Sequence, residues 1–413
     1  MPSRFVTLRR GELAALLPEL LLAGQLIDRS AMAWCIGAFG REGMTRIAIE
    51  EWMAASPVYT RRMQRALRYE GTDVVTIFKG LQLDIGAPPQ FMDFRFTVHD
   101  RWHGEFRLDH CGALMDVEPL GDDYVRAMCH DIEDPTFDAT AVATNAKARV
   151  RPIHRPPRRP ADRHPCCAWT VVIDDAHPAV TESAGCRRLR KTRAAALELD
   201  PIDPGDDGAA DYAGPLRSDI DFAAFSKSAL VRLADEVCLQ MHLLNLGFVH
   251  AVHDRADPEQ AHAICRRQLI GIAGLSAGRL HRSLGLPGGV EGALRLLELH
   301  PLLNPAVYVR ATVGDTVTVA ASPAHDDGAW ISLCGPHETG PLRAIVRAVD
   351  PHLDVEVEGT AVEWTARLVW RDEPAKEFDE VAVTRISTGA SFEFRPRRSI
   401  PITPVRPSGH TGS

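Results

Sequence analysis

Residues 74–83 read VVTIFKGLQL, and a related stretch, VEGALRLLEL, occupies residues 290–299, about 216 positions further along the chain. Nearly the same displacement relates FRFTVHD at residues 94–100 to VRATVGD at residues 309–315. A displacement that persists through helix-like and strand-like patterns is typical of an internal duplication. The sequence therefore predicts two tandem repeats that form a pseudo-two-fold pair.

Each repeat is predicted to pack helices on a small antiparallel sheet, which gives an α+β fold. In repeat one, apolar residues recur at three- and four-residue steps over residues 47–67, the spacing of a helix face that packs on a core. Pro57 interrupts this pattern. Because proline removes a backbone donor, we expect it to divide the stretch into two helices. Residues 74–85 predict a third helix, which ends at Gly86.

The rest of repeat one is predicted to hold four strand candidates and a short helix. Residues 91–108 alternate apolar and polar residues on both sides of a turn, which predicts an antiparallel hairpin. Residues 122–133 predict a short helix that ends before Pro135, since the residue preceding a proline disfavours helical backbone. Further strands are expected within residues 140–153 and 168–173.

These predictions divide the chain into five parts. The segment between the repeats is polar and rich in Asp, Gly and Pro, as linkers often are. The parts are an N-terminal helix (1–24), repeat one (25–177), the linker (178–220), repeat two (221–400) and a disordered tail (401–413).

Composition indicates a soluble, cytoplasmic protein. A chain of 413 residues that is 45% hydrophobic can bury two cores of ordinary size. The net charge of -8 gives no reason to expect nucleic acid or an anionic membrane as a partner. No apolar stretch is long enough to span a membrane. Nine cysteines without an export signal favour reduced thiols. The expected partner is a small molecule, and the oligomeric state stays open.

Cysteine and histidine gather in repeat one, whereas the aligned positions of repeat two lack most of them, with Cys334 matching Cys111 as an exception. This asymmetry predicts that reactivity belongs to repeat one and that repeat two is degenerate. The aligned replacements are Val346-Arg347 for Cys129-His130, Ala361 for Asn145, and Gly389-Ala390 for Cys166-Cys167.

Two cysteines are candidate nucleophiles. A thiolate needs a nearby base, and Cys129 has His130 as its neighbour in sequence, while Cys167 follows His164 closely. Either histidine would move the proton. The alternative is that these thiols are small buried apolar groups, an interpretation that applies equally to Cys111.

Arginines and acids near these cysteines widen the candidate site. Arg151 and Arg155 could bind a substrate carboxylate or phosphate, or could belong to a solvated basic loop. A group of acidic residues around Cys129 could take protons or hold a metal, although acids at a helix end are usually solvated. These acids are Asp131, Glu133, Asp134 and Asp138.

A metal is a further possibility. The chain has no C-x-x-C pair and no H-E-x-x-H helix, so a structural zinc finger is not expected. A divalent transition metal held by residues from distant segments would leave no spacing pattern. The candidate ligands are Cys111, Cys129, His130 and Cys167.

These residues resemble the L-2-aminothiazoline-4-carboxylic acid hydrolase-like family over about residues 90–175. The matching elements are Cys111, Cys129 with Asp131 or Asp134, Asn145, and Cys167-Ala168-Trp169. The resemblance implies a ring-opening hydrolase that cleaves a C–N bond of a small heterocycle, with Asn145 and Trp169 among the substrate contacts. The stretch IEDPTFDATA at residues 132–141 also resembles a segment of uncharacterised bacterial proteins.

The sequence thus leads to one main hypothesis and two alternatives. The main one is a hydrolase of cyclic amidines or amides, in which Cys129 or Cys167 attacks the ring carbon and an arginine holds a substrate carboxylate. The first alternative is a protein that binds a metal or small ligand without catalysis. The second is a scaffold with no reactive site.

Overall fold

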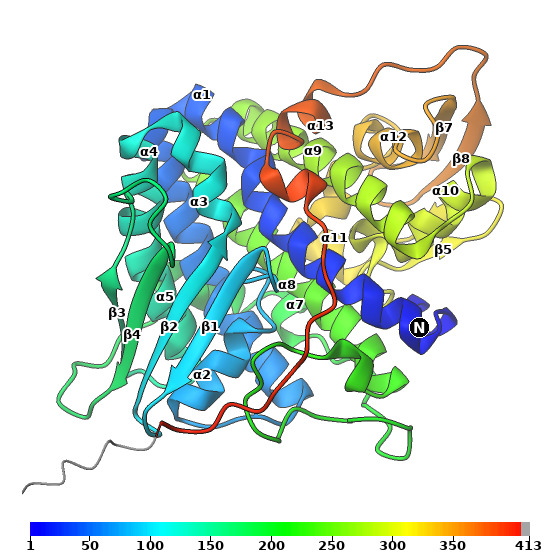
Figure 1. The fold of residues 1–413 in the computed structure, drawn as a ribbon. Helices are drawn as coiled ribbons and strands as arrows, with labels where there is room; N and C mark the ends of the chain where they lie inside the picture. The colour runs from blue at the N-terminus through cyan, green and yellow to red at the C-terminus, as the bar shows by residue number, and fades with distance from the viewer. Residues whose placement is uncertain (406–413) are drawn as a thin grey trace, which may run out of the picture.

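The computed structural model describes residues 1–405 and has an α+β fold. Long helices occupy the middle of the molecule, and one four-stranded antiparallel sheet lies on each side of them (Figure 1). The central helices are α1 (Arg10–Ala66), α8 (Lys227–His253) and α9 (Pro258–Leu284), with α1 packed on both others. The α+β class predicted from the sequence is confirmed.

Helix α1 corrects two predictions. It continues through residues 24 and 25, so the expected boundary between an N-terminal helix and repeat one falls inside a helix. It also continues through Pro57, and the helical backbone is interrupted instead at Gly40 (φ 67°, ψ 177°). Pro57 cannot donate to the carbonyl of Met53, one turn earlier, but the hydroxyl of Ser183 donates to that oxygen at 3.3 Å. A residue distant in sequence thus replaces the lost hydrogen bond.

The first sheet has the strand order β1-β2-β4-β3, with every neighbouring pair antiparallel. The predicted hairpin is confirmed, and helix α2 (Val74–Leu81) precedes it. The sheet packs its apolar face, which includes Phe106 and Trp169, into the core. Its strands are β1 (Met92–Val98), β2 (His103–Cys111), β3 (Ala148–His154) and β4 (Cys167–Ile173).

Helical structure between β2 and β3 runs further than predicted. The chain does not leave the helix before Pro135, because the π-helical turn continues directly into α5 and both Ile132 and Glu133 keep right-handed helical backbone. Residues 140–142 are therefore helical and not part of a strand. The segments are α3 (Gly112–Val117), α4 (Asp122–Arg126), a π-helical turn (Ala127–Ile132) and α5 (Glu133–Val142).

The second sheet has the order β5-β6-β8-β7, again antiparallel throughout. One predicted alignment is wrong, because Gly389-Ala390 lie in a 3-10 turn after the sheet, whereas Cys167 begins a strand. The elements of this half are α10 (Gly289–Leu299), β5 (Ala311–Val313), β6 (Val317–Val319), α11 (Pro323–Asp327), α12 (Gly340–Arg347), β7 (Leu353–Gly359), β8 (Trp364–Trp370) and α13 (Asp379–Thr384).

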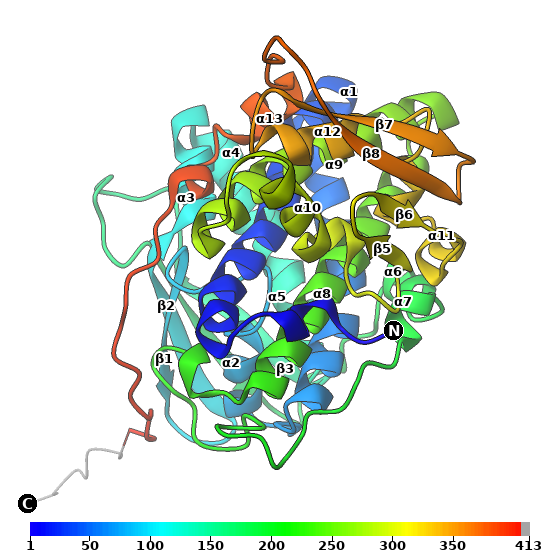
Figure 2. The same ribbon diagram turned by 90° about the vertical axis from the view of Figure 1, so that its right-hand side faces the viewer.

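The two halves share one hydrophobic core, which includes Phe106 from the first half and Trp330 from the second. The expected linker is partly packed, since α6 (Ala184–Leu189) and α7 (Arg193–Ala196) bury side chains against the helices. Figure 2 shows the N-terminal segment running beside α8. Short 3-10 turns occur at Arg4–Thr7, Glu118–Leu120, Phe222–Ala224, Pro301–Leu303, Trp330–Leu333 and Thr388–Ser391.

The expected tail is described only in part. The backbone N–H of Ile402 donates to the carbonyl of Leu216 at 2.7 Å, and that of Val405 donates to the carbonyl of Val98, at the end of β1, at 2.9 Å. The remainder of the predicted disordered tail, 406–413, lies outside the described residues.

Candidate functional site

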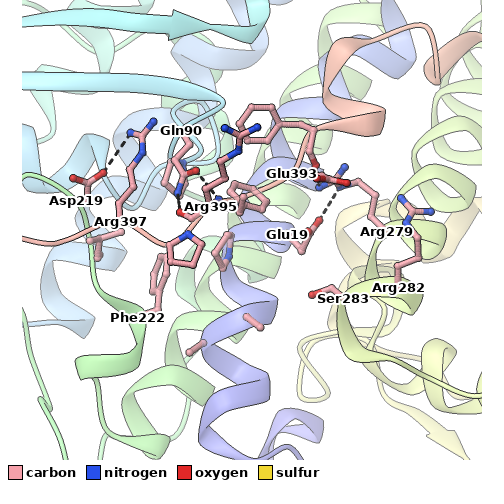
Figure 3. Close-up of a pocket in the computed structure, with 18 of the residues that line it drawn as sticks. Glu19, Gln90, Asp219, Phe222, Arg279, Arg282, Ser283, Glu393, Arg395 and Arg397 are labelled. Carbon is pink, nitrogen blue, oxygen red and sulfur yellow. Dashed lines mark hydrogen bonds and ion pairs between the residues drawn. The ribbon is translucent and has the colours of Figure 1, made fainter.

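A cleft of about 1120 Å³ lies where the C-terminal segment crosses α1 and α9 (Figure 3). Several of its charged groups hold that segment in place. Arg279 donates to Glu19 at 2.7 Å and to the carbonyl of Gly389 at 2.9 Å, and Arg397 lies 3.5 Å from Asp219. These groups are therefore committed to structural contacts.

A second cavity, of about 80 Å³, lies inside the first half and differs in chemistry. It is lined by residues of α1, of the connection from α2 to β1, of strand β1, and of the helical segment that contains α5. Its volume suits several waters or a small polar molecule. We call it the carboxyl cavity. Its polar lining residues are Gln25, Asp28, Arg29, Ser56, Tyr59, Asp84, Glu133, Thr136 and Thr140.

Asp84 follows α2 and is almost fully buried. Its Oδ1 accepts hydrogen bonds from the Tyr59 hydroxyl and from the backbone N–H of Gly86, both at 2.7 Å. Within residues 1–405, this arrangement leaves Oδ2 available to a ligand. Burial raises the pKa of Asp84 to about 6, while the two hydrogen bonds act in the opposite direction. Asp84 is thus ionised at neutral pH and close enough to titration to accept a proton.

Glu133 is the first residue of α5 and is also buried. Burial raises its pKa to about 8, the positive charge of Arg155 lowers it, and the negative charge of Asp134 raises it. Its Oε2 is buried and has no hydrogen-bond partner in the described part of the chain. The carboxyl group is therefore protonated at neutral pH and can donate that proton, as a general acid does.

A second carboxyl pair lies on α1. Burial is the main cause that raises the pKa of Glu51 well above its ordinary value, and the neighbouring Asp28 raises it further through its charge and a side-chain hydrogen bond. Arg29 approaches Asp28 at 3.1 Å. The Nε of Arg29 and the Oε1 of Gln25 are buried without partners among the described residues. Burying such atoms lowers the stability of the fold unless water or a ligand forms hydrogen bonds with them.

The predicted cysteines lie near the carboxyl cavity but do not line it. Burial is the main cause that raises the pKa of Cys111, Cys129 and Cys167, and the charge of Glu133 raises each further. All nine cysteines of the chain are free and buried. These surroundings favour the thiol over the thiolate.

The predicted metal ligands are not assembled. In the part of the chain that the structure describes, one group of at least three His, Cys, Asp or Glu residues has ligand atoms within 4.8 Å of one another, and it contains none of Cys111, Cys129, His130 and Cys167. The ring nitrogen Nε2 of His130 instead lies 2.7 Å from the carbonyl oxygen of Pro156.

Two predicted substrate contacts lie beside the cavity. Arg155 pairs with Asp134, and its guanidinium lies 5.9 Å from the ring centre of Trp169. Trp169 is fully buried. Because the charge of Arg155 lowers the pKa of Glu133, Arg155 belongs to the electrostatic surroundings of the cavity.

Three other predicted residues lie elsewhere. The side chain of His164 is 63% exposed and 3.7 Å from Asp109. The amide of Asn145 donates to a backbone carbonyl in the connection between α1 and α2. Arg151 forms an ion pair with Asp138 at 2.9 Å, on the outer face of the first sheet. These side chains are held by local contacts and do not line the cavity.

Sequence reasoning included Glu133 among the acids near Cys129 but missed Asp28, Arg29, Tyr59 and Asp84. A spacing pattern could have drawn attention to Asp28, together with Glu51. Asn245 and Gln268 are separated by the same number of residues as Asp28 and Glu51, and they follow them by about 217 positions. Both amides are buried, and Asn245 donates to Gln268 at 3.0 Å.

Comparison of the chain with protein-family models, curated proteins and solved structures finds no match. Within residues 1–405, every helix is too short or too polar to cross a membrane. The chemistry of the site therefore has to be inferred from its own residues.

Proposed function

We propose that the protein is a hydrolase that binds a small polar substrate in the carboxyl cavity and uses Glu133 as general acid and Asp84 as general base. The observation that carries this proposal is the convergence of buried carboxyl groups whose pKa values, about 8 and about 6, lie on either side of neutrality. Strongly shifted carboxyl groups that line one cavity are a common property of acid–base sites.

We further propose that the halves derive from a duplicated unit and that the second has lost its reactive groups. The identical strand order of the two sheets supports this origin. Asn245 and Gln268 then correspond to Asp28 and Glu51, and a hydrogen-bonded amide pair replaces an acid pair. The helices can thus pack at these positions without ionisable groups, which favours a functional role for the acids of the first half.

The resemblance to the aminothiazoline carboxylate hydrolases suggests a substrate class, a small cyclic amidine or amide that carries a carboxylate. In the proposed reaction, Asp84 takes a proton from water while the water oxygen bonds to the ring carbon. The C–N bond breaks, and Glu133 gives its proton to the departing nitrogen. One water is added overall, and Arg29 holds the substrate carboxylate.

The reactive groups in this proposal are carboxyl groups and not thiols. A thiolate nucleophile at Cys129 or Cys167 would require a lowered pKa, whereas burial raises the pKa of both thiols. The carboxyl groups need no such change, because each is already in the protonation state that its role requires at neutral pH.

The test is a screen of small cyclic amidines and amides for a thermal shift of the full-length protein, followed by measurement of the released amine. Activity should rise as Asp84 ionises near pH 6 and fall as Glu133 ionises near pH 8. Glu133→Gln should lower the rate about 10²- to 10⁴-fold.

A variant that copies the amide pair of the second half sharpens the test. The double substitution Asp28→Asn with Glu51→Gln should lose ligand binding, with circular dichroism to check that the variant folds, while Glu356→Gln, at a 55% exposed side chain in the middle of β7, should behave as the wild type. Full activity in the double variant would contradict the proposal. Binding without turnover would favour the alternative of a ligand-binding protein.

A further inference from the structure

A separate cluster of metal-binding residue types lies where the β1–β2 hairpin turns. His99, His103 and Glu105 each offer one ligand atom, and these atoms all lie within 4.8 Å of one another. No other group of three such residues meets this distance between residues 1 and 405. The cluster lies on the opposite face of β2 from Phe106, which packs in the core, so it is distinct from the carboxyl cavity.

The hairpin holds these side chains in place before any ion binds. His103 and Glu105 are alternate residues of β2 and therefore point to the same face of the sheet. The backbone N–H of His99 donates to the carbonyl of His103 at 3.1 Å. The carboxylate of Asp100 accepts hydrogen bonds from the backbone N–H groups of Trp102 at 2.7 Å and His103 at 2.9 Å, which fixes the turn.

The contacts within the cluster are unusual for a simple surface ion pair. The Nε2 atom of His99 lies 3.2 Å from Oε1 of Glu105, yet it is buried and makes no hydrogen bond to any described residue. The two imidazole rings have centres 4.5 Å apart. His103 is steadied by the hydroxyl of Thr170, 3.3 Å from its Nε2. The ligand atoms thus face a common point without being satisfied by one another.

We propose that His99, His103 and Glu105 bind a divalent transition metal ion of the zinc type. Two imidazoles and one carboxylate suit zinc, cobalt, nickel or copper, whereas magnesium and calcium prefer oxygen ligands. Three protein ligands leave a further coordination position for water or an external ligand. The Glu105 side chain is 39% exposed, so ions can reach the cluster from solvent.

The test is a zinc titration of the full-length protein in competition with a chromophoric chelator. One equivalent should bind to the wild type. His99→Ala, His103→Ala and Glu105→Gln should each weaken binding by more than the roughly 10- to 100-fold loss typical of a residue that only supports a ligand. His352→Ala, which removes a histidine from the turn before β7, should leave the affinity unchanged.

Two further measurements make the outcome independent of whether a variant folds. Zinc should raise the melting temperature of the wild type, because an ion that binds only the folded state stabilises it. Cobalt should give the intense visible absorption of a site with low coordination number. An absence of both effects, or wild-type affinity in all three variants, would overturn the assignment. Loss of zinc binding without loss of substrate binding would separate this site from the carboxyl cavity.

Discussion

Replacing Glu133 with glutamine should stabilise the protein at alkaline pH. Glutamine has nearly the same shape as glutamic acid but cannot ionise. In the wild type, burial holds the pKa of Glu133 at about 8, compared with 4.5 for an unperturbed glutamate. The folded state therefore retains a proton that the unfolded chain releases, and stability falls as the pH rises from about 4.5 to about 8.

The size of the effect follows from the difference in pKa. Each pKa unit corresponds to about 1.4 kcal/mol, so the full difference amounts to about 5 kcal/mol once the pH exceeds 8. Near pH 6 the same relation gives about 2 kcal/mol. At pH 4, where both states are protonated, the wild type and Glu133→Gln should have nearly equal free energies of unfolding. The gap between them should then widen by about 3 kcal/mol between pH 6 and pH 9.

The assay is urea unfolding of both proteins at pH values from 4 to 9, with the free energy obtained by linear extrapolation. Glu356→Gln supplies the control, because it makes the same chemical change at a side chain that is 55% exposed. A change there should stay within about 0.5 kcal/mol at every pH. If the difference between wild type and Glu133→Gln is constant across the range, Glu133 does not carry a raised pKa and the proposed general acid is wrong.

Two other predictions concern the core. Glu236→Ala removes the acceptor of two hydrogen bonds from the buried guanidinium of Arg62, at 2.9 and 3.0 Å, and should destabilise the protein by about 3–5 kcal/mol in urea unfolding. Cys129 and Cys167 should react with iodoacetamide far more slowly in the folded protein than in urea, as followed by mass spectrometry of labelled peptides. Rapid labelling with a lowered apparent pKa would instead support a thiolate nucleophile.

The sequence predicted those elements whose pattern depends only on neighbouring residues. Alternation over residues 91–108 and 168–173 marked three strands of the first sheet, because one face of these strands is buried and the other is not. The prediction at Pro57 failed because the compensating hydroxyl of Ser183 is distant in sequence. Local rules for proline cannot include a partner supplied by the tertiary fold.

The site was harder to predict for a related reason. Cysteine and histidine attract notice because they are rare, whereas the buried carboxyl groups resemble surface acids in sequence. Asp28 and Glu51 lie in a helix that packs on two others, and only that packing removes them from water. Asp84 follows a short helix, where an acid would ordinarily be solvated. The raised pKa values of Glu51 and Asp84 arise mainly from burial, which a sequence pattern does not record.

The contrast between the halves bears on why these acids are kept. A buried carboxyl without a full set of partners destabilises the fold, and the pKa of Glu133 implies a cost of about 5 kcal/mol at alkaline pH. Under the proposed duplication, Asn245 and Gln268 show that neutral amides can also occupy these positions, although Asn245 Oδ1 and Gln268 Nε2 are buried without partners among the described residues. Packing alone therefore does not require acids at these two positions. Under the proposed function, the acids of the first half persist because the reaction requires them.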